Sequence, residues 1–257
     1  MCLQGEGEVV RVHLELIGRD ASRAAKRGDV TVIVDVLRSS STIITALSNG
    51  ARGIIPACTL KEAVQLYENH PKALLAGERN MVKPPTFHMG NSPLEYTRNR
   101  VLGRTIILTT TDGTRAIKLA SKGAKAVLIG AFLNASSVAH ASYDLALKME
   151  ADISLIAVGK KGRFAIEDFL GAGFIIRRLP NVRRLIDSAL IDDGALWAYY
   201  SAEIAEKNLK ETICQGEHAK KLRTSGFHKD VEFCSRVDVF NSVPILEKSI
   251  LVEYKIP

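Results

Sequence analysis

Short apolar runs recur between residues 31 and 158, and segments of helical period separate most of them. The runs are rich in β-branched residues, which is typical of strands buried on both faces of a parallel sheet. Because strands and helices alternate, the chain is expected to form crossover units. We therefore predict a three-layer α/β/α fold with a mostly parallel or mixed sheet. The runs are residues 31–36, 53–56, 73–76, 105–108, 126–129 and 153–158, and the helical segments are residues 42–48, 60–69, 114–121 and 134–149.

The two ends of the chain differ from this pattern. Residues 9–16 alternate apolar and polar side chains, which predicts a half-buried strand at a sheet edge. From Glu167 to about Thr224 the pattern is helical, and residues 237–252 look β-like again, broken at Pro244. No repeat or linker separates these parts. We predict a single α/β domain over residues 1–257, with a mainly helical C-terminal section at residues 167–236 packed on the same domain.

The net charge of +7 leaves three classes of partner open: nucleic acid, a membrane surface or an anionic small molecule. Nucleic-acid binders cluster basic residues and interleave aromatic ones, whereas aromatic residues are only 6% here and the basic residues are spread along the chain. The densest basic cluster, at residues 177–184, is interpreted as a solvated face. We therefore expect no nucleic-acid partner and keep the anionic small molecule.

Cysteine spacing and hydropathy bear on the cellular location. The four cysteines form no CxxC pair and show no zinc-ligand spacing to a histidine. The N-terminal residues lack the basic flank and apolar run of a signal peptide, and no apolar stretch approaches the ~20 residues of a membrane span. We expect a cytoplasmic protein without a membrane partner, and leave a homo-oligomer open.

In open α/β sheets, ligands bind at the carboxyl ends of the strands. The first polar motif in such a position is residues 35–42, where Asp35 ends a buried strand and a run of hydroxyl residues opens a helix. Hydroxyl side chains cap helix starts, and the amide groups there bind anions. Capping alone explains the serines but not Asp35 and Arg38 beside them.

The second motif, residues 109–115 (TTTDGTR), also follows an apolar strand and precedes a helix. Gly113 permits a tight turn, and Arg115 could bind a phosphate bidentately. The alternative is an ordinary Asp-Gly turn with a threonine cap.

Two further motifs follow predicted strands. Glu78 and Arg79 precede a loop at residues 80–91, long enough to be a functional lid, although the two could form a simple surface ion pair. Glu167 and Asp168 stand at a helix start, where acids complement the dipole and are also hard ligands for Mg²⁺.

Several known chemistries lack their signature. The six histidines show no HExxH and no paired spacing, so neither histidine catalysis nor a zinc site is expected. No GxGxxG, Walker loop or GxSxG elbow is present. An aspartyl-phosphate mechanism would want a second acid two residues after Asp35, and that position is Leu37.

Taken in order, these motifs resemble the 2-phosphosulfolactate phosphatase family. The matching segments are VDVLRSSSTIITAL, LLAGERN, GNSPLEY, LTTTDGTRA, GAFLNAS, the acidic helix start at Glu167 and KDVEFCSRVDVFNSVP. The resemblance implies a Mg²⁺-dependent acid phosphatase for phosphate esters of 2-hydroxy acids, of the type linked to coenzyme M biosynthesis. Asp112 replaces the asparagine usual in the family, and Ser39 replaces a frequent alanine.

The motifs and the resemblance together give a candidate site. We expect the substrate to be a small anionic phosphate ester, and the resemblance implies 2-phosphosulfolactate. Whether Asp35 is a metal ligand, a base or a nucleophile is left open. The candidate catalytic residues are Asp35, Arg38, Glu78, Arg79, Asp112 and Arg115; the substrate-binding ones are Ser39, Ser41, Thr42, Asn91, Ser92, Thr110, Thr111, Gly113, Thr114 and Asn134; the Mg²⁺ ligands are Asp35, Glu167 and Asp168.

Two other classes of function remain as alternatives. One is a non-catalytic binding module for an anionic phosphorylated metabolite, which would bind its ligand without releasing phosphate. The other is an interaction protein that uses the basic cluster at residues 177–184 and binds nucleic acid in a salt-dependent way.

Overall fold

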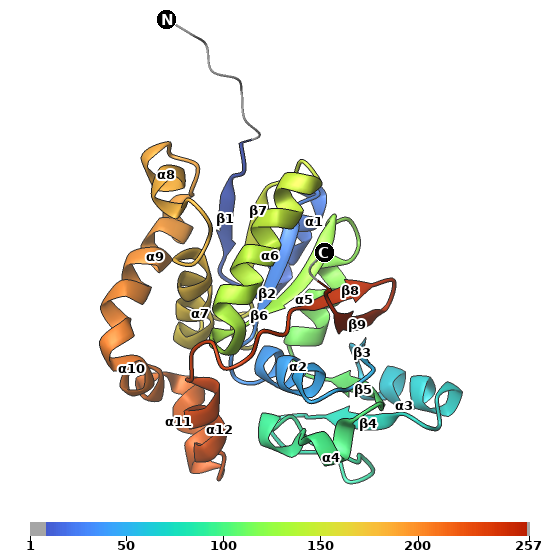
Figure 1. The fold of residues 1–257 in the computed structure, drawn as a ribbon. Helices are drawn as coiled ribbons and strands as arrows, with labels where there is room; N and C mark the ends of the chain where they lie inside the picture. The colour runs from blue at the N-terminus through green and yellow to red at the C-terminus, as the bar shows by residue number, and fades with distance from the viewer. Residues whose placement is uncertain (1–8, 256–257) are drawn as a thin grey trace, which may run out of the picture.

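The computed structural model describes residues 9–255, which form one sheet of nine strands with helices on both faces (Figure 1). The strand order is β1-β7-β2-β6-β8-β9-β3-β5-β4. The predicted α/β/α fold with a mixed sheet is confirmed. The strands are β1 (Val12–Glu15), β2 (Val30–Val34), β3 (Gly53–Ala57), β4 (Leu74–Gly77), β5 (Thr105–Thr109), β6 (Ala126–Gly130), β7 (Ile153–Ala157), β8 (Pro244–Glu247) and β9 (Ile250–Glu253).

The sheet consists of two parallel blocks joined by a hairpin. Strands β1, β7, β2 and β6 form one block, and β3, β5 and β4 form the other. The hairpin of β8 and β9 lies between them and pairs antiparallel with β6 at Leu128–Ile245 and with β3 at Ile54–Leu251. Because the chain direction reverses at three successive pairings, the two blocks run in opposite directions.

Helices cover both faces of the first block. Helices α6 and α7 contact each other and strands β2, β6 and β7, while α1 and α5 contact each other and β2. Helix α9 packs on α7 and on the edge strand β1, and α10 to α12 continue below it in Figure 1. The α-helices are α1 (Ala21–Arg27), α2 (Ser39–Ser48), α3 (Leu60–Asn69), α4 (Arg98–Val101), α5 (Gly113–Ala120), α6 (Ala135–Lys148), α7 (Ile166–Ile176), α8 (Val182–Asp187), α9 (Asp193–Ala205), α10 (Leu209–Gln215), α11 (Glu217–Thr224) and α12 (His228–Cys234).

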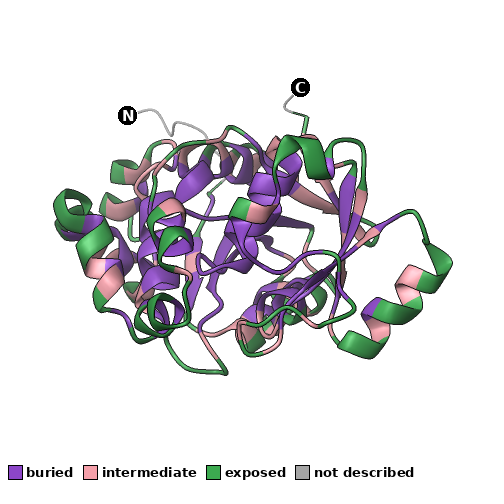
Figure 2. Ribbon diagram, turned by 90° about the horizontal axis from the view of Figure 1, so that it is seen from below, coloured by how far each residue is buried: buried purple, intermediate pink, exposed green. Residues whose placement is uncertain are grey.

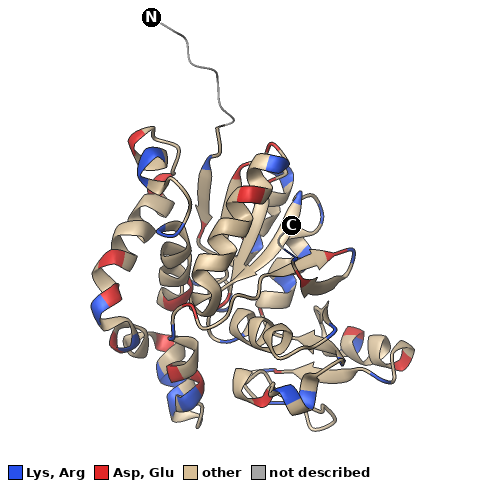
Figure 3. Cartoon of the chain, viewed as in Figure 1, with Lys and Arg blue, Asp and Glu red and all other residues tan. Residues whose placement is uncertain are grey.

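The apolar runs of the sequence became the buried strands. Every residue of β2, β6 and β7 is buried, and Figure 2 shows the burial concentrated in the sheet and the helix faces against it. Lysine, arginine, aspartate and glutamate are absent from these three strands and lie mainly on helices and loops (Figure 3). The helices expected at residues 42–48, 60–69, 114–121 and 134–149 correspond to α2, α3, α5 and α6, whereas α1 and α4 had no clear periodic signal.

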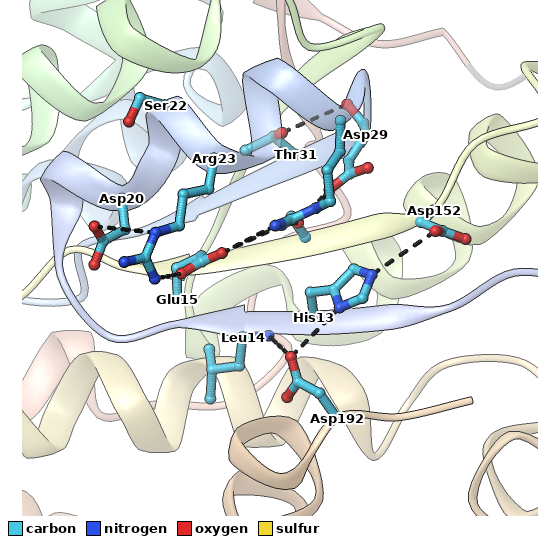
Figure 4. A network of polar contacts seen from close by, with 12 residues as sticks. His13, Leu14, Glu15, Asp20, Ser22, Arg23, Asp29, Thr31, Asp152 and Asp192 are labelled. Carbon is cyan, nitrogen blue, oxygen red and sulfur yellow. Dashed lines mark hydrogen bonds and ion pairs between the residues drawn. The ribbon is translucent and has the colours of Figure 1, made fainter. Parts of the chain in front are cut away.

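The edge strand β1 is fixed by charged side chains on both of its sides (Figure 4). His13 lies 3.5 Å from an oxygen of Asp192 and 3.7 Å from one of Asp152, and the hydrogen bond to Asp192 raises the pKa of His13. Glu15 accepts hydrogen bonds from Arg23 and Arg27. This network ties β1 to α1, to the start of β7 and to the start of α9, and so explains how an edge strand of four residues is held.

The basic cluster near residue 180 is partly paired. Arg177 contacts Glu206 at 2.9 Å, and Arg178 contacts Asp238 at 2.9 Å. Both arginines also lie over aromatic rings of the same region. Among the described residues, no helix combines the length and the apolar character needed to cross a bilayer.

Helices α7 and α9 approach so closely that one glycine cannot be enlarged. A Cβ at Gly173 would lie 2.2 Å from the carbonyl oxygen of Ala198. We predict that Gly173→Ala lowers the free energy of unfolding by at least about 1–3 kcal/mol, because the helices must move apart. Urea denaturation measures the change.

Gly194→Ala is the matched control on α9. Its Cβ would make only ordinary contacts, 3.5 Å from Asp192 Oδ1. Since alanine favours a helix by up to about 1 kcal/mol over glycine, this variant should be neutral or slightly more stable. Equal stability of the two variants would contradict the close approach.

Candidate active site

A cleft lies where the carboxyl ends of the two blocks face each other. Asp35 and Lys160 reach it from the loops after β2 and β7, whereas Glu78 and Asp112 reach it from the loops after β4 and β5. The strand-end rule therefore holds for each block, but the site is not at one edge of a single parallel sheet, because the blocks run in opposite directions. The space between the walls of the cleft is about 270 Å³, a volume that includes open solvent at the mouth. The cleft is lined by Asp35, Leu37, Arg38, Glu78, Met81, Asn91, Thr110, Thr111, Asp112, Lys160 and His218.

Asp35 is one of two buried acids of the cleft, 9% exposed, and Glu78 is the other. Burial raises the pKa of Asp35 to about 6; the charges of Lys160 and His218 oppose this rise, and the nearby Asp112 adds to it. Gly113 packs directly against the carboxylate, since a Cβ there would lie 2.6 Å from Asp35 Oδ2. The start of α5 can therefore approach Asp35 only because this residue is glycine.

Asp112 joins the two walls of the cleft. Its Oδ2 accepts a hydrogen bond from the backbone N–H of Lys161 at 3.1 Å, and Lys160 Nζ lies 3.9 Å away. The loop after β5 thereby holds the loop after β7. An asparagine could accept the same hydrogen bond, so what the carboxylate adds at position 112 is its charge beside Lys160.

Glu78 organises the loops around it as an ionised group. It accepts hydrogen bonds from the N–H of Met81 at 2.8 Å and from both the N–H and the hydroxyl of Thr111 at 2.9 and 2.8 Å. Burial alone would raise its pKa, but these bonds and the charge of Lys160 lower it. Glu78 thus orders the turn at residues 78–82 and the loop after β5.

Arg38 forms a buried ion pair with an acid from the helical section. Its Nη1 donates to Asp230 Oδ2 at 2.6 Å, and both side chains are less than 5% exposed. Asp230 also accepts from the Ser92 hydroxyl at 2.7 Å, and the ring of Phe227 stacks on the guanidinium at 4.2 Å. Asp230 was not among the predicted residues, although its segment was part of the family resemblance.

Asn91 lines the cleft and carries a buried acceptor that has no partner among residues 9–255. Its residue is 6% exposed, and Oδ1 is buried without a hydrogen-bond partner within the described residues. Unsatisfied buried acceptors are rare in folded proteins, and one that lines a cleft suggests a ligand contact.

His218 lines the cleft and, like Lys160, was not among the predicted site residues. It comes from α11, is 9% exposed, and its Nδ1 lies 3.2 Å from Glu167 Oε1. A carboxylate beside Nδ1 fixes that nitrogen as the donor and leaves Nε2 for the cleft. The isolated histidine carried no motif, because its partner lies 51 residues away.

The predicted metal trio is not assembled as a carboxylate cage. Asp168 accepts a hydrogen bond from the N–H of Val36 with Oδ1 and one from the N–H of Gly159 with Oδ2. It therefore links the ends of β2 and β7. Burial, with the charges of Asp35 and Glu167, raises its pKa well above the ordinary value. Glu167 faces His218, and no group of three or more His, Cys, Asp or Glu in residues 9–255 is arranged to hold a metal ion.

Two of the three predicted arginines do not reach the cleft. Arg79 donates to the carbonyls of Glu78 and Cys58 and to the Thr109 hydroxyl, and so secures strand ends. Arg115 is exposed and lies outside the cleft lining. Of the predicted arginines, the cleft contains Arg38 alone, and its second cation is Lys160.

The predicted substrate-binding residues divide into two groups. Asn91, Thr110 and Thr111 line the cleft, and Ser39 and Gly113 lie directly against Asp35. Asn134 is a correction, since its amide spans Ala131, Ile129 and Ser242 within the core. The remaining predicted residues use their hydroxyl groups in hydrogen bonds to other parts of the protein. They are Ser41, Thr42, Ser92 and Thr114.

The buried pair of Arg38 and Asp230 should contribute strongly to stability. We predict that Asp230→Asn lowers the free energy of unfolding by about 3–5 kcal/mol, because the guanidinium loses its buried counter-charge. Glu232→Gln on the same helix is the control, since Glu232 pairs with Lys210 at the surface. Urea denaturation should show little change for the control, and equal effects of the two variants would contradict the assignment.

Asp35 should destabilise the metal-free protein above pH 6. Its folded pKa is raised, so the stability it provides in acid is lost as the pH rises through about 6. We predict that Asp35→Asn is more stable than the parent chain at pH 8, by up to about 3 kcal/mol, and that the difference shrinks towards pH 4. Thermal unfolding with EDTA measures this, with the exposed Asp144→Asn as control. A difference that does not vary with pH would contradict it.

Comparison with known proteins identifies the family of the chain. The model of the family described as 2-phosphosulpholactate phosphatase matches residues 17–249. A protein of Thermotoga petrophila named "Probable 2-phosphosulfolactate phosphatase" is 41% identical over 226 residues, which cover 88% of this chain and 92% of that protein. A protein of the same name from Caldanaerobacter subterraneus is 38% identical over 222 residues, covering 86% and 88%. The chain therefore belongs to the 2-phosphosulpholactate phosphatase family, a family of phosphoric monoester hydrolases.

Proposed function

We propose that this chain is a Mg²⁺-dependent phosphatase that hydrolyses the monoester of a small 2-hydroxy acid, 2-phosphosulfolactate to sulfolactate and phosphate. The observation that carries the proposal is the cleft in which a buried acid, Asp35, lies near the cation of Lys160 and beside the starts of helices α2 and α5. The names of the relatives support the choice of substrate.

The cleft suits a phosphate group. Helices α2 and α5 begin beside Asp35, at Ser39 and Gly113, and the positive ends of helix dipoles favour anions. Lys160 adds a mobile cation, and the hydroxyls of Thr110 and Thr111 lie in the same wall. These groups would bind a phosphate dianion while excluding much of the water around it.

The donors of the cleft fit a hard cation. Mg²⁺ in phosphate-processing sites is held by one or two carboxylates together with waters and substrate oxygens, so a closed protein cage is not needed. Asp35 and Asp112 would supply the carboxylates, and the unpartnered Oδ1 of Asn91 a neutral oxygen. A bound Mg²⁺ polarises a phosphoryl oxygen and makes its water more acidic. Asp168 is replaced as a ligand because both of its oxygens accept hydrogen bonds from backbone amides, and Glu167 because its Oε1 faces His218 and it does not line the cleft.

His218 would act on the leaving group. The alkoxide of a hydroxy acid is a poor leaving group, so a proton must reach the ester oxygen as its bond to phosphorus breaks. Glu167 holds the imidazole by Nδ1, and Nε2 would donate the proton to the leaving oxygen. The same proposal includes a role in coenzyme M biosynthesis, which the resemblance implies, and a cytoplasmic location, which the sequence patterns favour.

Phosphate release from 2-phosphosulfolactate and from p-nitrophenyl phosphate tests this function. Activity should require Mg²⁺ and be lost with EDTA. His218→Gln should lower the rate on the alkyl ester by about 10²–10⁴-fold, and far less on the nitrophenyl ester, whose leaving group needs no proton. His140→Gln, at an exposed position on α6, is the control.

Each outcome of this panel decides one part of the proposal. Full activity in metal-free protein would rule out the metal. Equal losses on both esters would rule out His218 as the proton donor. Tight binding of the ester without phosphate release would favour the binding module instead.

A further inference from the structure

A second, larger hollow lies directly beside the cleft. It runs between the loop after β7 and the start of α11, and measures about 1350 Å³ out to open solvent, against about 270 Å³ for the cleft. Lys161, Arg163 and Phe164 line this groove, and they do not line the cleft.

The groove and the cleft are immediate neighbours with shared walls. Met81, Lys160 and His218 line both of them. A ligand whose phosphate lies in the cleft can therefore extend past His218 into the groove. Because His218 stands at this junction, the groove lies on the side where the leaving group would depart.

The loop that forms one wall has a defined shape. Lys160 and Arg163 exchange backbone hydrogen bonds at 2.9 and 3.0 Å around a tight turn. Gly162 has a φ of +73°, and a Cβ at Gly159 would lie 2.1 Å from the carbonyl oxygen of Arg163. The turn fixes the backbone from which Lys161 and Arg163 project, so their charges are presented at set positions.

Arg163 is a cation without an acidic partner. Within residues 9–255 no carboxylate lies within 4.0 Å of its guanidinium, whereas Lys221 across the groove pairs with Glu217 at 2.6 Å. Lys161 Nζ is 3.5 Å from Asn80 Oδ1, a neutral group. Two exposed cations are therefore available to an anion in the groove, next to the ring of Phe164, which is 53% exposed.

We propose that this groove binds the alcohol part of the ester, with its carboxylate or sulfonate held by Lys161 and Arg163 and its carbon chain against Phe164. The inference rests on the proposed phosphatase function. It assigns recognition of the second anion to the loop after β7, in place of Arg79 and Arg115, which lie outside the cleft. The substrate class is then a phosphate monoester whose leaving alcohol is itself anionic.

Arg163→Ala tests the proposal with two esters of similar size, 2-phosphosulfolactate and glycerol 2-phosphate, whose alcohol is neutral. The contact is to the part of the substrate that does not react, so its loss should raise KM with little change in kcat. We expect the preference for the anionic ester, the ratio of kcat/KM values, to fall about tenfold. Lys161→Ala should act in the same direction, and Arg223→Ala on α11 should leave the ratio unchanged.

Failure of the groove and failure of the phosphatase function are distinguishable. If the parent chain is active but Arg163→Ala and Lys161→Ala lower kcat/KM for both esters by the same factor, the groove does not bind the second anion. If the parent chain hydrolyses neither ester, the proposed function is wrong. Calorimetric measurement of sulfolactate binding then still tests whether the groove binds the anion. Affinity for sulfolactate should then fall about tenfold in Arg163→Ala, and an unchanged affinity would overturn the proposal.

Discussion

The reversal of strand direction at the C-terminal hairpin determines where the cleft forms. Strands β8 and β9 lie between the two parallel blocks and pair antiparallel with both. The carboxyl ends of the two blocks nevertheless meet at the cleft, where the loops after β2 and β7 form one wall and those after β4 and β5 form the other. In a sheet that was parallel throughout, these loops would lie side by side along one edge.

Buried charge is the second constraint on this region. Asp35 has a raised pKa because burial disfavours its carboxylate, and Asp168 is held by two backbone amides at the ends of neighbouring strands. Arg38 is compensated by Asp230, and Glu167 by His218. Buried ionisable groups are costly unless paired, and their concentration in one cleft is typical of a functional site. The helical section supplies both Asp230 and His218, so it completes the cleft as well as covering the sheet.

The structure brings part of the predicted site into one cleft and leaves other predicted residues outside it, and the roles of these residues stay predictions. Asp35, Glu78 and Asp112 could be placed in the cleft because they directly follow strands, and a strand end fixes the backbone to within a residue or two. The roles of Arg79 and Arg115 could not be predicted, because a long side chain reaches several ångströms in any direction from the same backbone position. Tertiary contacts turned Arg79 towards strand-end carbonyls and left Arg115 in solvent.

The sequence by itself determined the alternation of strands and helices, the buried central strands and the loops that carry the polar motifs, because these follow from local periodicity and turn residues. Only the tertiary structure decided which loops meet. The opposite direction of the two blocks depends on single pairings with the C-terminal hairpin. One of them joins Leu128 of β6 to Ile245 of β8, more than 100 residues further along the chain. The partnership of Glu167 with His218 depends in the same way on helix packing. Such contacts leave no local pattern, because they arise from the burial of surfaces that are distant in the chain.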